Sequence, residues 1–129
     1  MKKAILINVE SQSFEIILIE DGLNPIYNAI GNGCDTFACP IIFDNEDTIY
    51  SDDEILLRVG DIKGGFLMRD WIAPIVNNAI VLGTDEDGES VDCKTTIEYL
   101  ERNTIFFDAP FCKEYAIEVM NQPPRIYTL

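Results

Sequence analysis

The stretch from residue 74 to residue 100 constrains the fold more than any other part of the chain. It begins with an apolar run over 74–83, continues with an acidic turn over 84–88, and reaches a helix start between Asp92 and Thr95. Short apolar runs that are rich in Ile and Val and bounded by turn residues are typical of buried strands. We therefore predict a central strand, a solvated turn and a helix that packs back across the sheet.

The N-terminal part of the chain predicts a hairpin followed by a short helix. Two runs rich in β-branched residues, 3–9 and 13–20, are separated by a few polar residues. Asn24 and Pro25 then have the pattern of an N-cap followed by proline at the first helical position. We expect a short helix over 25–30.

The C-terminal part predicts two helices with a strand between them. Thr95 and Glu98 match the capping-box pattern, which predicts a helix that ends near residue 103. Residues 104–107 predict a short strand. The last helix is expected to face the core with an apolar stripe at intervals of four residues, made of Phe111, Tyr115 and Val119.

These elements predict an α+β fold in one domain over residues 1–129, with a short tail over 122–129. We expect a mostly antiparallel sheet of about five strands, with two or three helices packed on one face. Pro40 lies in a predicted strand over 35–43. Because proline donates no hydrogen bond to a sheet, it places this strand at an edge or at a bulge.

Length and composition predict one substantial core and no membrane association. The chain has 129 residues, of which 47% are apolar. Its longest apolar runs are far shorter than the roughly 20 residues that cross a bilayer. Asn8 and Glu10 interrupt the N-terminal apolar run before it could form the core of a signal peptide. We therefore expect a cytoplasmic protein.

The charge balance is the strongest compositional signal. Asp and Glu number 23, Lys and Arg number 9, and the formal net charge is -14. Such a surface repels phosphate backbones, so we expect no direct nucleic-acid binding. The acidity serves solubility, or else it forms a surface that engages a basic partner or imitates DNA.

The absence of histidine lowers the expectation of an enzyme, because histidine is the commonest general base and transition-metal ligand. Asp85, Asp87 and Glu89 alternate as calcium ligands do in an EF-hand. The sixth position of such a loop would be Ser90 and its twelfth Thr96, where glycine and glutamate are needed. We therefore predict no enzymatic activity, no cofactor and no metal site.

Cysteine spacing does not indicate a disulfide framework or a zinc site. Only Cys34 and Cys39 come near the spacing of paired zinc ligands, and neither a second pair nor a histidine completes a site. A reducing compartment disfavours disulfides. We expect Cys34, Cys39, Cys93 and Cys112 to be buried free thiols.

Two segments have a pattern in common with known proteins. The first reads Asn-Asn-Ala-Ile-Val-Leu-Gly-Thr-Asp-Glu-Asp-Gly-Glu and ends in Thr-Ile-Glu-Tyr-Leu-Glu-Arg, over 77–102, and the second covers 5–50 more loosely. Both resemble a family of small bacterial domains of unknown function carried by phages, plasmids and conjugative elements. The resemblance implies a mobile-element or gut-bacterial context, and it assigns no activity or site residue.

Three functions from different classes remain open. The first is a module that binds a protein partner, a basic one included; the second is a DNA mimic that inhibits a basic DNA-binding protein; the third is a small-molecule binder that uses carboxylates in a pocket. We favour the first because it needs only the charge and a stable fold. Two carboxylate clusters form the candidate acidic interaction surface: Asp44, Glu46, Asp47, Asp52, Asp53, Glu54, Asp85, Glu86, Asp87, Glu89 and Asp92.

Overall fold

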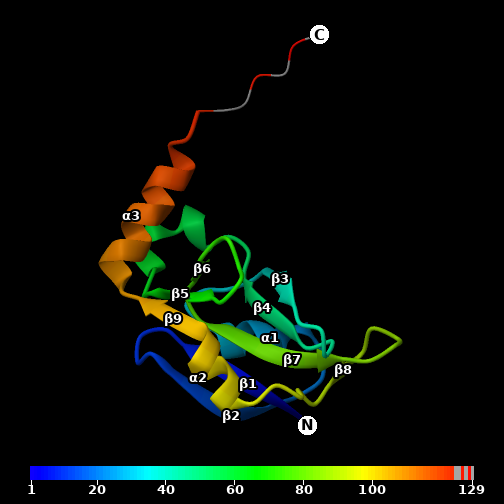
Figure 1. The fold of residues 1–129 in the computed structure, drawn as a ribbon. Coiled ribbons are helices and arrows are strands. Elements are labelled where there is room, and N and C mark those ends of the chain that lie inside the picture. The colour runs from blue at the N-terminus through cyan, green and yellow to red at the C-terminus, as the bar shows by residue number, and fades with distance from the viewer. Residues whose placement is uncertain (124–125, 127, 129) are drawn as a thin grey trace.

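Over the described part of the chain, the computed structural model contains two antiparallel sheets and three α-helices, and the last helix projects from the body (Figure 1). The structure describes residues 1–123, 126 and 128. The expected α+β class is confirmed. In chain order the elements are β1 (Lys2–Asn8), β2 (Ser13–Ile19), α1 (Leu23–Ile30), β3 (Phe37–Ile42), β4 (Thr48–Asp52), the 3₁₀ turns η1 (Ile55–Leu57) and η2 (Val59–Asp61), β5 (Gly65–Met68), β6 (Ile75–Val76), β7 (Ala79–Thr84), β8 (Ser90–Val91), α2 (Ile97–Asn103), β9 (Thr104–Phe107) and α3 (Ala109–Met120).

β7 is the central strand of the larger sheet, as the sequence predicts. The strand order is β2-β1-β7-β4-β3, and β8 pairs with the end of β7. Val81 lies opposite Ile5 of β1 on one side and Ile49 of β4 on the other. β7 is buried from Ala79 to Gly83. A strand enclosed in this way needs an unbroken apolar run, and residues 79–83 supply one.

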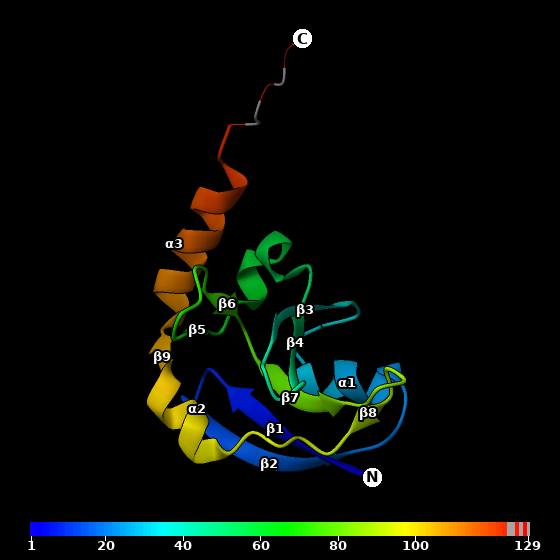
Figure 2. The same cartoon turned by 45° about the vertical axis from the view of Figure 1, so that its right-hand side comes forward.

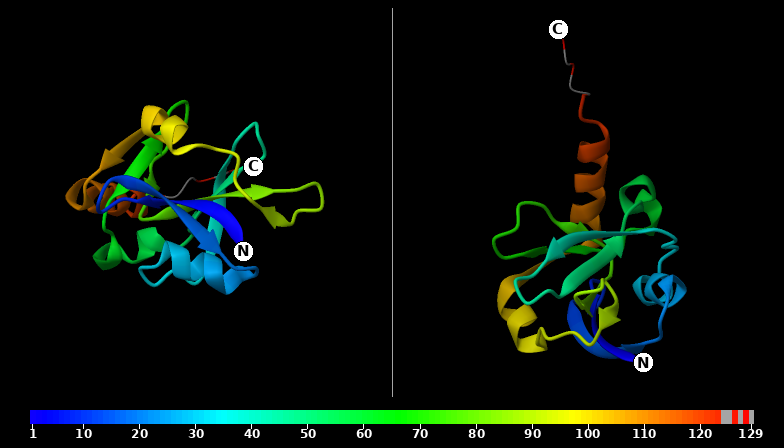
Figure 3. Two further views of the ribbon diagram at one scale, coloured as in Figure 1. Left: turned by 90° about the horizontal axis from the view of Figure 1, so that it is seen from below. Right: turned by 90° about the vertical axis from the view of Figure 1, so that its right-hand side faces the viewer.

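Helices and the smaller sheet cover both faces of the larger sheet, so the expectation that the helices pack on one face is corrected. Ile26 and Ile30 of α1 pack with Ile80 on one face. Leu100 of α2 belongs to the cluster around Val81 on the other face, together with residues of the smaller sheet (Figure 3). Because β7 is apolar on both sides, each of its faces must be buried.

The apolar run over 74–83 forms two strands in two sheets instead of one central strand. β6 joins the smaller sheet, ordered β6-β5-β9, and β7 joins the larger one. Asn77 separates them with a φ of 68°. Its buried side chain accepts a hydrogen bond from the Lys63 amide at 2.6 Å and donates one to the Asp61 carbonyl at 2.9 Å. Asparagine tolerates this left-handed conformation better than most residues, so it turns the chain from one sheet into the other.

The cap of α2 is Thr96, and the expectation of Thr95 is wrong by one residue. The Thr96 hydroxyl accepts a hydrogen bond from the Tyr99 amide at 3.1 Å. Thr95 is unsuited to this role because both its hydroxyl and its amide bind Asp47. Glu98 does not reach back to the cap but pairs with Arg102 at 2.6 Å. The helix ends at residue 103, as predicted.

The start of α1 differs from the prediction. The helix begins at Leu23 and follows Gly22, so Asn24 is not its N-cap and Pro25 is not its first residue. Proline fits here because the amides of the first helical turn have no partner within the helix.

The buried residues of α3 each lie one position C-terminal to a residue of the predicted stripe. Cys112 and Ala116 are buried against the 3₁₀ turns, whereas Phe111 is 50% exposed, and Tyr115 and Val119 are half-buried. Small side chains allow this close approach: a Cβ atom added at Gly65 would lie 2.8 Å from Cys112 Sγ.

The outer strands of the larger sheet are β2 and β3. β3 is an edge strand with a register shift between Ala38 and Ile41, which confirms both expectations for Pro40. β1 and β2 form the predicted hairpin, and β2 lies at the opposite end of the molecule from the C-terminal end of α3 (Figure 2). The predicted tail over 122–129 falls partly outside the described residues. No helix in the described part of the chain is long and apolar enough to cross a membrane.

Candidate functional site

Exposed carboxylates from both predicted clusters meet at one end of the larger sheet. The turn between β3 and β4 and the turn between β7 and β8 project from the same end, because Thr48 at the start of β4 pairs with Leu82 near the end of β7 (Figure 1). We call this region the acidic end. Its exposed carboxylates are Asp44, Glu46, Asp85, Glu86, Asp87 and Glu89.

Asp47 is buried and has a structural role, so it is no part of the interaction surface. Its Oδ2 accepts hydrogen bonds from the Lys94 amide at 2.9 Å, the Thr95 amide at 2.7 Å and the Thr95 hydroxyl at 2.6 Å. These bonds fasten the segment before α2 to the turn between β3 and β4. A buried carboxylate requires such donors to offset its lost hydration.

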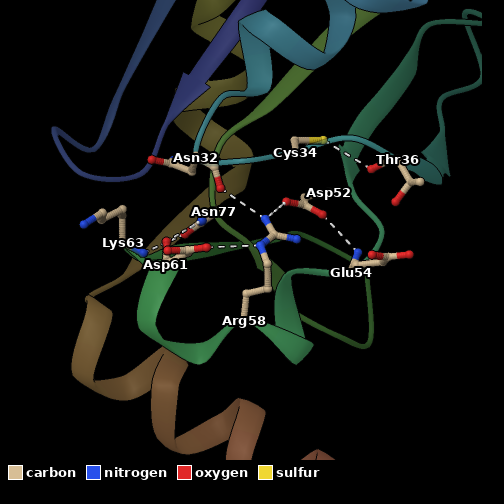
Figure 4. Close-up of polar contacts among 9 residues, drawn as sticks. All are labelled: Asn32, Cys34, Thr36, Asp52, Glu54, Arg58, Asp61, Lys63 and Asn77. Carbon is tan, nitrogen blue, oxygen red and sulfur yellow. Dashed lines mark hydrogen bonds and ion pairs between the residues drawn. The ribbon is translucent and has the colours of Figure 1, made fainter.

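Asp52 is also buried, and it holds Arg58 in a polar network at the C-terminal end of β4 (Figure 4). Asp52 Oδ2 lies 2.6 Å from Arg58 Nη2, and Asp61 Oδ2 lies 3.1 Å from Arg58 Nε. Arg58 also donates to the Asn32 carbonyl at 3.1 Å. The hydrogen bond to Asp52 is the main cause that raises the pKa of Arg58. The network ties the 3₁₀ turns to the end of β4.

Three further predicted carboxylates are exposed but lie outside these two turns. Asp53 and Glu54 are exposed, but they lie beyond the opposite end of β4. Asp92 is exposed, and its Oδ1 accepts a hydrogen bond from the Lys3 amide at 2.7 Å. The structure therefore brings together six of the eleven predicted residues.

A hollow of about 570 Å³ lies beside the acidic end, between β3, the loop after β5 and the segment that leads into α2. Ile41 and Met68 are buried in its floor. Its volume is within the range of sites that receive ligands or anchor side chains. We call it the aromatic hollow and define it by the side chains that line its walls: Ile42, Phe43, Arg69, Trp71, Lys94 and Tyr99.

A tight turn forms one wall and presents Trp71. The Trp71 amide donates to the Met68 carbonyl at 3.1 Å, and the Arg69 amide donates to the Asn103 carbonyl at 2.8 Å. Asp70, at the third position of the turn, has a φ of 65°. Turns with a left-handed residue there usually carry glycine or asparagine, and aspartate is among the residues that tolerate it. The two hydrogen bonds fix the backbone beside Trp71.

The opposite wall is braced by ring contacts. Phe43 and Tyr99 are edge to face, with ring centroids 6.0 Å apart. Lys94 Nζ donates to the Asn45 carbonyl at 3.3 Å. Asp47 supports this wall from below, because it binds the amide of Lys94. The hollow therefore depends on three segments distant in sequence.

The exposed groups around the aromatic hollow have the composition of a protein-binding hot spot. Trp71 is 41% exposed, Tyr99 is 48% exposed, and the neighbouring Ile72 is 99% exposed. Trp, Tyr and Arg are the residues that most often dominate binding energy at interfaces. The Arg69 side chain forms neither an ion pair nor a hydrogen bond with any residue that the structure describes. It is thus available to a partner.

One sequence feature points to this hollow, although the sequence analysis did not single it out. Trp71 is the only tryptophan in the chain and lies two residues after Arg69. A lone tryptophan close to an arginine is a candidate binding anchor. The other walls have no such signal, because β3 and the segment that leads into α2 are distant from Trp71 in sequence and only the fold brings them together.

The four cysteines are free thiols, but their burial varies. Cys93 and Cys112 are buried as expected, Cys34 is half-buried and Cys39 is exposed. Burial raises the pKa of Cys34 and of Cys112 to about 11, and Asp52 adds to the effect at Cys34. Both thiols therefore stay protonated and weakly nucleophilic at neutral pH. Among the described residues, no group of three or more Cys, Asp or Glu side chains is placed to hold a metal ion.

Comparisons of the chain with protein-family models, with curated proteins and with solved structures find no match.

Proposed function

We propose that this protein is a non-enzymatic protein-interaction module whose partner inserts an apolar side chain into the aromatic hollow. The observation that carries the proposal is the exposed Trp71, held by a hydrogen-bonded turn at the wall of a hollow of about 570 Å³. An anchor that is rigid before binding loses little entropy on binding, which favours affinity. Loss of such a residue from an interface costs about 2 kcal/mol or more.

The charge of the molecule supports a basic partner. A net charge of -14 attracts a basic protein and repels a second copy of the same chain. Asp44 of the acidic end lines the hollow, and Glu46 lies in the same turn as Asp44. In the proposed complex, the acidic end steers the partner and the aromatic hollow supplies most of the binding energy.

The context of the proposal rests on sequence resemblance alone. The likeness of 77–102 and 5–50 to small domains of phages, plasmids and conjugative elements supports a mobile-element or gut-bacterial setting. We place the protein in the cytoplasm within that proposal.

The two alternatives have less support. A DNA mimic needs an extended row of exposed carboxylates; six from both clusters meet at the acidic end, whereas Asp47 and Asp52 are buried and Asp53 and Glu54 lie away from it. A small-molecule binder that uses carboxylates needs them in a concave site. Of the predicted carboxylates, only Asp44 lines the aromatic hollow.

Affinity capture with matched variants tests the proposal. The tagged protein, a Trp71→Ala/Tyr99→Ala variant and a Leu57→Ala/Ile117→Ala control are incubated with lysate of the encoding organism at low and physiological salt. Leu57 and Ile117 are 65% and 50% exposed and lie outside the hollow. We expect a basic protein that the wild type and the control retain and the hollow variant loses. Equal retention by all three, or no reproducible retention, would contradict the proposal.

A further inference from the structure

The two edges of the larger sheet differ in how they are protected. β3 contains Pro40 and a register shift, which blunt its outer edge. β2 pairs with β1 at all seven of its residues without interruption, and it contains no proline. Its only charged residue is Glu15. Natural edge strands usually carry devices against further pairing, and the charge of Glu15 is the one that β2 has.

The side chains of β2 present a different chemistry on each face of the sheet. Ile16 and Leu18 are 56% and 67% exposed, and they share a face with Phe14 because side chains alternate along a strand. Phe14 is covered by Phe106, with ring centroids 5.4 Å apart. Glu15 is exposed on the opposite face.

Carboxylates also flank both ends of β2. Glu10 lies in the turn before it and Glu20 directly after it, and both are exposed. Asp21 pairs with Lys2 at 2.5 Å, and this contact lowers the pKa of Asp21. The charge along the edge is therefore negative, whereas its apolar side chains gather on one face.

We infer that the free edge of β2 binds an extended segment of a basic protein as an added strand. Main-chain groups of the segment pair with β2, alternate apolar side chains extend the strip of Ile16 and Leu18, and the Lys or Arg residues between them approach Glu15. A second copy of the chain fits less well, because each copy carries a net charge of -14. No residue of β2 lines the aromatic hollow, and the inference does not rest on the proposed function.

A peptide titration tests the inference. The probe is a capped peptide of alternating valine and lysine, as long as β2, and its control has the same composition with the valines and lysines in separate blocks. Amide chemical shifts locate binding, and fluorescence anisotropy measures affinity. We expect perturbed amides along β2, and affinity about tenfold higher for the alternating peptide.

Two charge reversals serve as matched variants. Glu15→Lys should weaken binding of the alternating peptide about tenfold, whereas Glu118→Lys, an equal change in net charge on α3, should weaken it less than about threefold. Trp71→Ala should leave it unchanged. Equal loss in both charge variants, equal affinity for both peptides, or shifts confined to other elements would overturn the inference.

Sedimentation of the protein alone tests whether a second copy of the chain binds the β2 edge instead. We expect a monomer over the concentrations of the titration. Self-association that Ile16→Lys abolishes and Ile105→Lys preserves would show that a second copy occupies the β2 edge, and this would overturn the assignment to a basic segment. Ile105 is a suitable control because it lies in another outer strand, β9, and is 62% exposed.

Discussion

At the scale of single residues, some acidic side chains in this protein are exposed on the surface and others are buried and structural, and the sequence does not distinguish the two roles. Asp44 and Asp47 lie in the same turn, yet one is exposed and the other is fully buried. Composition could not separate them, because the donors that bind Asp47 come from Lys94 and Thr95, nearly fifty residues away. Only the pairing of β4 with β7 brings these segments together.

Replacement of Asp47 by alanine should strongly destabilise the fold. The change leaves the buried amide of Thr95 without an acceptor and removes two further hydrogen bonds. We expect the free energy of unfolding to fall by about 3 to 5 kcal/mol. Asp44→Ala, in the same turn, should change it by less than about 0.5 kcal/mol. Urea unfolding measures the free energy of unfolding of both variants. Equal losses would show that Asp47 has no structural role.

Cys112 should make the fold sensitive to alkaline pH. Burial raises the pKa of its thiol from 9.0 to about 11, so the unfolded state loses this proton first as the pH rises. The contribution to stability is complete below pH 9 and disappears as the pH passes through 11. Its size is up to about 2 kcal/mol. Urea unfolding at several pH values should show a flatter decline for Cys112→Ala than for the wild type, and parallel curves would contradict this.

At the scale of elements, the positions of strands and helices along the chain were easier to predict from the sequence than the elements with which they pair or pack. The β1–β2 hairpin, the last strand β9 and the end of α2 follow from local patterns. The division of the run over 74–83 did not, because Asn77 resembles any polar residue within an apolar stretch. Its role comes from the carbonyl of Asp61 and the amide of Lys63, which only the folded chain places around it.

Asn77 should contribute much more to stability than another left-handed asparagine. Asn32 also has a positive φ, 52°, but it is exposed, and its side chain forms no hydrogen bond within the described residues. Asn32→Ala should cost about 1 kcal/mol for the backbone conformation alone. Asn77→Ala should cost about 3 kcal/mol because it also leaves buried groups unpaired. Equal costs in chemical denaturation would show that the Asn77 side chain has no anchoring role.

At the scale of the whole molecule, the charge could be predicted from the sequence, whereas the shape of the binding surface could not. The net charge and the two acidic clusters were predictable from the sequence, but their meeting at one end was not, because it depends on the pairing of β4 with β7. The aromatic hollow was not, because its walls come from β3, from the loop after β5 and from the segment before α2. Each wall is formed by a separate segment of the sequence, and the hollow forms only when the fold brings all three segments together.

The most direct test of the central claim uses Trp71 as its own reporter. As the only tryptophan, it gives a single ¹⁹F resonance when the protein is labelled with 5-fluorotryptophan. The captured partner is titrated into the labelled protein, and the solvent-isotope shift of this resonance is followed in H₂O and D₂O. We expect the resonance to move and its isotope shift to disappear as Trp71 becomes buried. An unchanged resonance in a complex shown to have formed would contradict this expectation.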